Sequence, residues 1–320
     1  MVTISRRSAL GGTLGLVSAA IGQSARAQGV PKEFHVGYQK GGFLSVSKDQ
    51  RGLERRLKEL GIADVKWSEF QFGPPMMEAL GAGAIDFGEV GDMPPIFAQA
   101  AGHRFVYAAR MPGSQHALLV PENSTIRALA DIKGKKIALA RGSSAHNVTV
   151  RLLAKAGLAY SDIVPAYLPP ADASAAFSRG SVDAWVVWDP YFALAERRQK
   201  ARAVATTKEI SGGNSFYVAN RDFAAKYAKV LTAVIEEVTK VTQWAAENRE
   251  KFAEAISAAI GIELDVELIA IGRAELAVGA ITPDVIAQQQ QTADVFLELG
   301  FLPRKITIRD AVWSSPSDRT

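Results

Sequence analysis

The chain has 320 residues, a length typical of about two domains. Hydrophobic residues make up 48% and charged residues 22%, which is the composition of a folded globular protein and excludes a disordered chain. Cysteine is absent, which excludes disulfides, thiol catalysis and cysteine-ligated zinc. The formal net charge is +4, so the position of the basic residues decides what that charge means.

The first 27 residues have the order of features found in an export signal. Arg6 and Arg7 precede a weakly apolar stretch at 9–22, and an Ala-Arg-Ala run at 25–27 provides a small-residue cleavage site. The arginine pair also resembles a twin-arginine signal, although Ala9 stands where phenylalanine is usual. Removing the segment lowers the net charge from +4 to +1, so the charge does not indicate a nucleic-acid partner. We expect a soluble periplasmic protein.

After this segment, short β-like runs alternate with helical patterns. The first half predicts strands at 34–39, 65–70, 85–88 and 105–109, with helices at 49–60, 75–82 and 94–101. The second half predicts strands at 117–120, 136–140, 163–168 and 184–188, with helices at 145–156 and 172–179. A strand at 216–219 is followed by an almost entirely helical pattern at 223–299. Alternation of this kind implies parallel sheets covered by helices.

The predicted fold class is α/β, with two lobes and a helical C-terminal tail. The first lobe is predicted at 28–116 together with 217–320, and its tail should pack back on the same lobe. The second lobe is predicted at 117–216, so that two crossovers form a hinge. The glutamine run at 288–291 is interpreted as the solvent-exposed face of a helix.

The strongest single motif follows the strand at 136–140 and opens a helix. Gly142 lets the backbone approach a ligand, and Ser143 and Ser144 add hydroxyl donors beside the helix N-terminus. His146 and Asn147 supply further polar groups from the first turn. The run predicts an anion site, and the alternative is that one serine only caps the helix.

Three other strand ends are candidates for the same cleft, because ligands of α/β sheets bind at the carboxyl ends of strands. Gln39 ends the first strand and could donate to an oxyanion. Gly73 and Pro74 begin one predicted helix, and Asp92 precedes another. A carboxylate beside an anionic ligand would be repulsive, so we interpret the Asp92 side chain as a helix cap.

Two tryptophans on the strand at 184–188 are expected to have different roles. Trp185 and Trp188 point to opposite faces of the strand, and Trp188 with Asp189 ends it on the cleft side. We therefore place Trp185 in the core and Trp188 in the cleft, where its ring could cover an alkyl chain. The four histidines have no ligand-like spacing, and no dinucleotide, phosphate-loop or nucleophile-elbow motif occurs, so no metal or cofactor is predicted.

Together these motifs resemble the aliphatic-sulfonate-binding proteins of bacterial ABC importers, within the wider group for nitrate, taurine and sulfonates. The most specific parts are the Ser-Ser-Ala-His-Asn run at 143–147 and the Trp-Asp-Pro-Tyr run at 188–191. The resemblance implies a type II periplasmic binding protein fold, a transmembrane permease with its ATPase as partners, and no catalysis. It also implies a sulfonate pocket made of Gln39, Gly73, Pro74, Asp92, Ser143, Ser144, His146, Trp188, Asp189, Asn214 and Phe216.

The chemistry of a sulfonate suits such a pocket, because a permanent monoanion needs several convergent donors and no proton exchange. The alternative ligands are taurine, nitrate and a sulfate ester, and Asp189 could hold the ammonium of taurine. An enzyme on the same fold is the alternative of another class; the precedents use a reactive cysteine, which this chain lacks. We expect a monomer that closes on its ligand.

Overall fold

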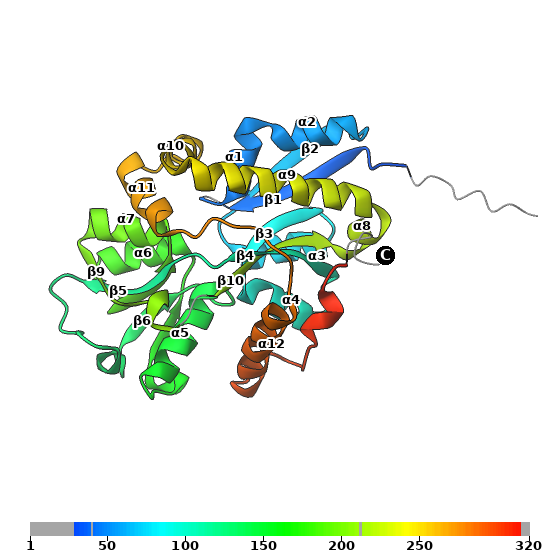
Figure 1. The fold of residues 1–320 in the computed structure, drawn as a ribbon. Coiled ribbons are helices and arrows are strands. Elements are labelled where there is room, and N and C mark those ends of the chain that lie inside the picture. Colours follow the sequence, from blue (N-terminus) through cyan, green and yellow to red (C-terminus); the bar gives the residue numbers. More distant parts are fainter. Residues whose placement is uncertain (1–28, 40, 211–212, 315–320) are drawn as a thin grey trace, which may run out of the picture.

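The computed structural model describes residues 29–39, 41–210 and 213–314. The predicted export signal therefore lies outside the described residues. Two five-stranded sheets form the centres of two lobes, which lie side by side in Figure 1.

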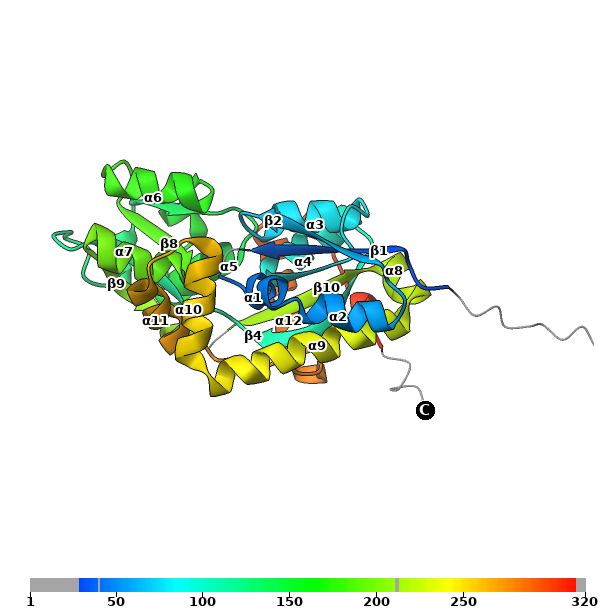
Figure 2. The ribbon, with the colours of Figure 1, turned by 90° about the horizontal axis from the view of Figure 1, so that it is seen from above.

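The first sheet has the strand order β2-β1-β3-β10-β4. Its strands are β1 (Glu33–Gln39), β2 (Asp64–Phe70), β3 (Phe87–Gly91), β4 (Phe105–Pro112) and β10 (Asn214–Asn220). One apolar cluster joins it to α3 (Gly73–Gly81), α4 (Met93–Ala101) and α12 (Pro283–Glu298). A second cluster joins the other face to α2 (Gly52–Glu59), α8 (Arg221–Lys226) and α9 (Ala228–Glu247), while α1 (Phe43–Gln50) lies at the end of β1 (Figures 1 and 2).

The second sheet repeats this arrangement with the order β7-β6-β8-β5-β9. Its strands are β5 (His116–Pro121), β6 (Lys136–Leu139), β7 (Val164–Tyr167), β8 (Ala184–Trp188) and β9 (Ala201–Thr206). Helix α5 (Ser144–Lys155) covers one face, and α6 (Pro170–Ser178) and α7 (Tyr191–Gln199) cover the other. Short 3-10 turns lie at Leu129–Ile132, Tyr160–Asp162, Thr207–Ile210 and Ile308–Ala311. Trp185 is buried in the second cluster of this lobe, as predicted.

The strand pairing places both lobe boundaries at slightly different residues from those predicted. His116 pairs with Trp188, so it belongs to the second sheet and not to the first. Asn214, Ser215 and Phe216 pair with β4, so they belong to the first sheet. The predicted helix at 49–60 covers α2 and only the end of α1, and the two helices meet at Arg51 in a left-handed conformation (φ 54°). Helix α7 and strand β9 were not predicted.

The two crossovers between the lobes are hydrogen bonded to each other. The backbone N–H of Gly113 donates to the carbonyl oxygen of Gly213 at 2.9 Å. A Cβ on Gly113 would lie 2.8 Å from the Gly213 backbone, so only glycine fits this close approach. The crossovers thus form one paired joint.

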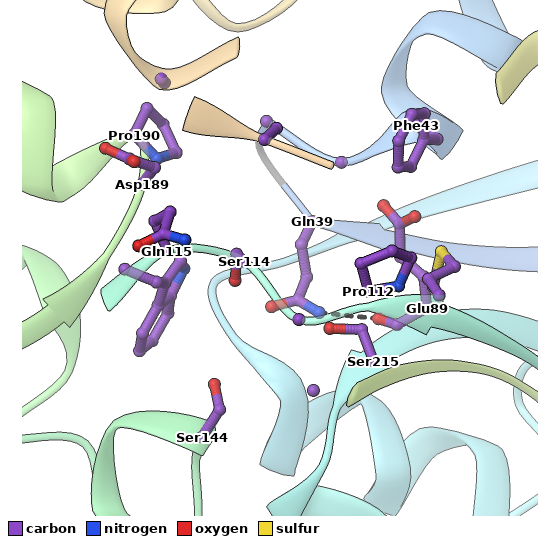
Figure 3. A pocket seen from close by; sticks show the side chains of 18 of the residues that line it. Gln39, Phe43, Glu89, Pro112, Ser114, Gln115, Ser144, Asp189, Pro190 and Ser215 are labelled. Carbon is purple, nitrogen blue, oxygen red and sulfur yellow. Dashed lines mark hydrogen bonds between the residues drawn. The ribbon is translucent and has the colours of Figure 1, made fainter. Parts of the chain in front are cut away.

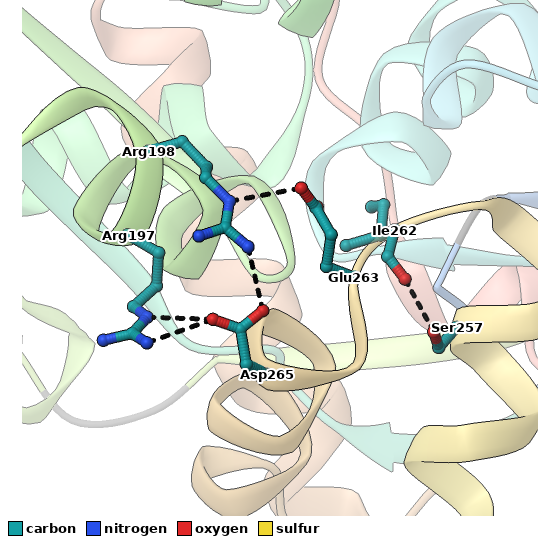
Figure 4. Close-up of polar contacts among 6 residues, drawn as sticks. All are labelled: Arg197, Arg198, Ser257, Ile262, Glu263 and Asp265. Atoms are coloured by element: carbon teal, nitrogen blue, oxygen red, sulfur yellow. Dashed lines mark hydrogen bonds and ion pairs between the residues drawn. The ribbon is translucent and has the colours of Figure 1, made fainter.

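The C-terminal helices contact both lobes, which differs from the predicted tail. Helix α9 packs along the first lobe, and α10 (Arg249–Ile260) and α11 (Leu264–Arg273) then reach the second lobe (Figures 1 and 2). Val266 of α11 is fully buried against Ala193 of α7. At the rim of this contact, Asp265 accepts hydrogen bonds from Arg197 and Arg198 at 3.0 Å each (Figure 4). We call α10 and α11 the C-terminal arm.

The glutamine run is partly internal, so its interpretation as a solvent-exposed helix face was wrong. Gln288 accepts a hydrogen bond from Asn214 at 3.1 Å. Gln289 is 2% exposed, and its amide donates to the Asp92 carbonyl oxygen and the Tyr107 hydroxyl. Gln290 donates to the carbonyl oxygen of Ile306 at 3.0 Å. These amides satisfy buried carbonyl groups and fix α12 against the first lobe.

We predict that apolar packing holds the arm on the second lobe more strongly than its ion pairs do. Asp265→Asn should lower the free energy of unfolding by about 1 kcal/mol or less, because its partners are half exposed, and 1 M salt should remove the difference. Val266→Ala should lower it by about 2 kcal/mol at any salt concentration, since it deletes buried methyl groups. Urea unfolding at two salt concentrations measures both. A larger loss for Asp265→Asn would contradict this ranking.

Candidate functional site

A cavity of about 170 Å³ lies between the lobes, at the carboxyl ends of β1, β3 and β8. Its lining includes residues of both sheets' strand ends, the first crossover and the C-terminal arm. Figure 3 shows Ser144 at one end of the cavity and Asp189, Pro190 and Phe43 at the other. We call this the interlobe cavity. Its two ends are made of different chemistry.

Five helices begin at the interlobe cavity, and in none of them does the side chain of the N-cap residue make a capping hydrogen bond. These helices are α1, α3, α4, α5 and α7. Uncapped first-turn N–H groups carry partial positive charge, which attracts an anion. The helix N-termini therefore bring partial positive charge to the cavity without a cationic side chain: among the described residues, its lining includes no lysine or arginine.

The five N-termini are not equally open to a ligand. Helices α3 and α4 have prolines at their second and third positions, and these have no N–H to donate. At α7 the N–H of Ala193 already donates to the carboxylate of Asp189 at 3.0 Å. Helix α5 has neither a proline at its start nor an acidic residue in its first turn. The N–H groups of Ser144 and Ala145 find no acceptor within the described residues, so α5 is the best anion-binding end.

Glu89 occupies the N-terminus of α1, and sequence reasoning missed it. Its carboxyl group lies beside the N–H groups of Phe43 and Leu44, yet burial raises its pKa to about 8. A Cβ on Gly42 would lie 1.5 Å from Glu89 Oε1, so no larger residue fits there. The glycine pair after β1 thus makes room for a carboxyl group. Only that glycine pair gave a signal in the sequence.

Ser143 and Ser144 line the cavity, but their hydroxyl groups are not the free donors we expected. Ser143 Oγ donates to the Ala140 carbonyl oxygen at 2.7 Å. His116 Nδ1 lies 2.8 Å from the Ser114 carbonyl oxygen and must donate to it. Its Nε2 therefore accepts from Ser144 Oγ at 2.9 Å. Burial lowers the pKa of His116 to about 4, which keeps the ring neutral and this arrangement fixed at pH 7.

Two glutamines bring amide groups to the cavity (Figure 3). Gln39 was predicted, and one of its N–H groups is already used, because Nε2 donates to the Glu89 carbonyl oxygen at 2.7 Å. Gln115 was missed. Its Oε1 accepts from Thr207 Oγ1 at 2.8 Å, which directs the opposite, N–H-bearing side of the amide away from Thr207. Residues of the crossover belong to no periodic pattern, so no feature of the sequence distinguishes Gln115 as a site residue.

The structure brings together six of the predicted site residues and separates five from them. Those that line the interlobe cavity are Gln39, Gly73, Ser143, Ser144, Trp188 and Asp189. Those that do not line it are Pro74, Asp92, His146, Asn214 and Phe216.

His146 lies on the other side of α5 from Ser144, because two residues along a helix turn the side chain by about 200°. It is fully buried, with ring contacts to Phe97, Phe296 and Phe301 at 4.7–6.4 Å between centroids. Its Nδ1 accepts from the Gly142 N–H at 3.3 Å. Burial lowers its pKa to about 4. His146 therefore packs the lobes together and does not contact the cavity.

Asn214 and Phe216 lie on the face of β10 that does not line the cavity, because side chains alternate between the two faces of a strand. The residue between them, Ser215, lines the cavity instead. Asn214 accepts from Arg110 Nε at 2.8 Å, and Phe216 packs edge-to-face on Tyr107 at 4.9 Å. The predicted residues thus differ from the residue that lines the cavity by one position, and one position along a strand reverses the face.

Asp92 and Pro74 contact the second lobe outside the cavity. The Asp92 carboxylate accepts from the Asn147 amide at 2.5 Å, where we had predicted a helix cap. This bond joins α4 to α5 across the lobes. Pro74 lies opposite Gly142, where an added Cβ would be 3.7 Å from Pro74 Cγ. Both residues fix how the lobes meet.

Two lobes of equivalent strand order, joined by two crossovers around a cavity lined by helix N-termini, define the type II periplasmic binding protein fold. The chain belongs to the NMT1-like family, whose family model matches residues 45–260.

Related proteins support this membership over nearly the whole chain. An aliphatic sulfonates-binding protein of Escherichia coli (strain K12) is 38% identical over 309 residues, 95% of each chain. The crystal structure of the periplasmic aliphatic sulphonate binding protein SsuA from Escherichia coli has a TM-score of 0.81 and covers 89% of this chain and 93% of its own. The alkanesulfonate-binding protein SsuA from Xanthomonas axonopodis pv. citri, bound to MOPS, has a TM-score of 0.84 at 36% identity and covers 88% of this chain and 98% of its own.

We predict that the backbone at Ser144, and not its hydroxyl, binds the ligand. Ser144→Ala should change affinity by about threefold or less while lowering stability by about 1 kcal/mol, because His116 Nε2 loses its donor. Ser144→Leu should reduce affinity at least about 100-fold, since its side chain would fill this end of the cavity. Calorimetric titration with thermal unfolding separates the effects. Equal losses in the two variants would mean that the hydroxyl contacts the ligand.

We predict that His146 makes stability depend on pH. Its pKa in the fold is about 4, below the ordinary value of 6.5, so the folded state binds fewer protons than the unfolded state between these values. The stability of the native protein relative to His146→Phe should be constant above pH 6.5. It should fall by up to about 1.4 kcal/mol per pH unit as the pH drops from 6.5 to 4. Denaturant titrations across this range measure it, and parallel curves would contradict the prediction.

Proposed function

We propose that the protein is a periplasmic solute-binding protein that captures aliphatic sulfonates between its lobes and delivers them to an ABC permease. The observation that carries the proposal is the uncapped N-terminus of α5 in the interlobe cavity. The sulfonate-binding relatives, at 36–38% identity over most of the chain, support the same ligand class.

The electrostatics of the cavity suit a sulfonate. A sulfonate is a monoanion at every physiological pH and offers three acceptor oxygens. The N–H groups of α5 and the amide of Gln115 are neutral donors, so they bind such a group with a smaller desolvation penalty than a buried arginine would incur. Trp188 lines the cavity nearby, where its indole ring can cover an alkyl chain.

The pairing of Ser144 with His116 does not make this cavity a hydrolase site. A general base should have a pKa near the working pH. The pKa of His116 is about 4, so it is a poor base at pH 7. The chain also has no cysteine for a thiol reaction. The pair instead holds the start of α5 in place.

The proposed partners are a transmembrane permease and its ATPase, and the working unit is a monomer that reaches the periplasm through its N-terminal signal. Within the described residues, none of the helices has the length and apolar character to cross a membrane. Ligand would favour the closed arrangement of the lobes, and the closed lobes would dock on the permease.

The test is calorimetry on the chain from Gln28 onward, after unfolding and refolding to remove carried-over ligand. The panel is methane-, pentane- and octanesulfonate, nitrate and sulfate. We expect micromolar or tighter binding of alkanesulfonates and no detectable binding of nitrate or sulfate. Binding of nitrate or sulfate in preference to every sulfonate would overturn the proposal.

The variant Trp188→Ala tests whether this side chain contacts the alkyl tail of the ligand. We predict that it weakens octanesulfonate by at least about tenfold and methanesulfonate by about twofold or less, because only a long chain reaches the ring. Trp185→Phe is the matched control, since Trp185 is buried in the core and does not line the cavity. Equal losses for both sulfonates would place Trp188 at the sulfonate head.

A further inference from the structure

The end of the interlobe cavity opposite α5 contains buried carboxyl groups whose charge no cation fully balances. Glu267 of the C-terminal arm lines this end and is 1% exposed, and its Oε1 has no hydrogen-bond partner. Asp189 lies at the same end (Figure 3); its side chain is 8% exposed and its Oδ2 is likewise unpartnered. A buried polar atom without a partner is rare in a folded protein and requires an explanation.

The cation at this end is shared among several carboxyl groups. Arg273 faces Asp189 Oδ1 at 3.5 Å and also forms an ion pair with Glu196. Its guanidinium lies 4.0 Å from the centre of the Phe192 ring. Among the described residues, none forms an ion pair with Glu267. Arg273 therefore pairs with two carboxyl groups, and none of the described residues supplies a cation for Glu267.

An ionised carboxylate in this position is unfavourable unless a cation comes with the ligand. Burial raises the pKa of Glu267 to about 7 and that of Asp189 to about 6, and the Asp189 charge adds to the effect on Glu267. A protonated amine would restore the balance, because it supplies both charge and hydrogen-bond donors. An uncharged alkyl tail would leave both orphaned oxygens without a donor.

We propose that Glu267 and Asp189 form a cation subsite, and that the preferred ligand is a sulfonate whose tail carries a protonated amine. This proposal rests on the proposed function, which supplies the sulfonate at α5. The cavity holds the two charges apart: Ser144 marks the anion end and Asp189 the cation end (Figure 3). Phe43 and Phe252, stacked at 5.4 Å between centroids, also line the cavity and offer an apolar surface to the methylene chain between the charges.

The test compares two ligands of equal size, 3-aminopropanesulfonate and 1-butanesulfonate, which differ by an ammonium in place of a methyl group. Calorimetry at pH 7.5 should give at least tenfold tighter binding of the amine. Glu267→Gln should reduce this preference to about twofold or less while changing the affinity for butanesulfonate by less than threefold. The matched control is Glu254→Gln, which removes the same charge from an exposed position on α10, outside the cavity lining, and should keep the full preference.

The outcomes separate the subsite from the proposed function. If butanesulfonate binds as well as the amine in the native protein, the cation subsite is wrong and the sulfonate site stands. The same conclusion follows if Glu267→Gln retains the preference. If neither ligand binds, the proposed function fails and the subsite fails with it. If Glu267→Gln does not fold, the ratio of the two ligand affinities in the native protein decides whether the cation subsite exists.

Discussion

The meeting of five helix N-termini at one cavity is the constraint on which this molecule depends. Each terminus carries partial positive charge, and a protein that concentrates them must supply hydrogen-bond acceptors or leave them for a ligand. Here the carboxyl group of Glu89 lies at α1 and that of Asp189 at α7, and α5 is left open. The two ends of the cavity therefore differ: one end accepts an anion and the other carries carboxyl groups.

The lobes are joined by far more than their crossovers. The Asp92 bond to Asn147 and the aromatic rings around His146 join the lobes on one side of the cavity. The C-terminal arm joins them on the other, through Val266 and the exposed ion pairs of Asp265. Because the arm also places Glu267 in the cavity, the contacts that close the molecule and those that line its ligand site belong to the same helix.

Much of this organisation could be predicted from periodicity. The alternation of strands and helices gave both lobes, and the rule that ligands lie at strand ends selected Gln39, Ser144 and Trp188. The errors arose where facing direction or distant packing decides the outcome. His146 is one half-turn from Ser144, and Phe216 is one residue from Ser215, so the predicted side chains lie on the faces that do not line the cavity.

Other residues could not be found from the sequence at all. Glu267 joins Asp189 across 78 positions of chain, and only the packing of α11 on α7 brings them together. Glu89 sits on a strand whose neighbours are buried, where a lone glutamate carries no motif. The glutamine run has the polarity of a surface, and tertiary contacts with buried carbonyl groups override that polarity.

The bond between Gly113 and Gly213 has a consequence for which groups a ligand meets when the lobes are apart. Ser114 and Gln115 follow Gly113 directly, so they lie beside the joint and would move little relative to either lobe. Helix α11 packs on α7 of the second lobe, so Glu267 stays with Asp189 and with the start of α5. Both ends of a ligand are then contacted by groups attached to one lobe, and the other lobe has only to cover it.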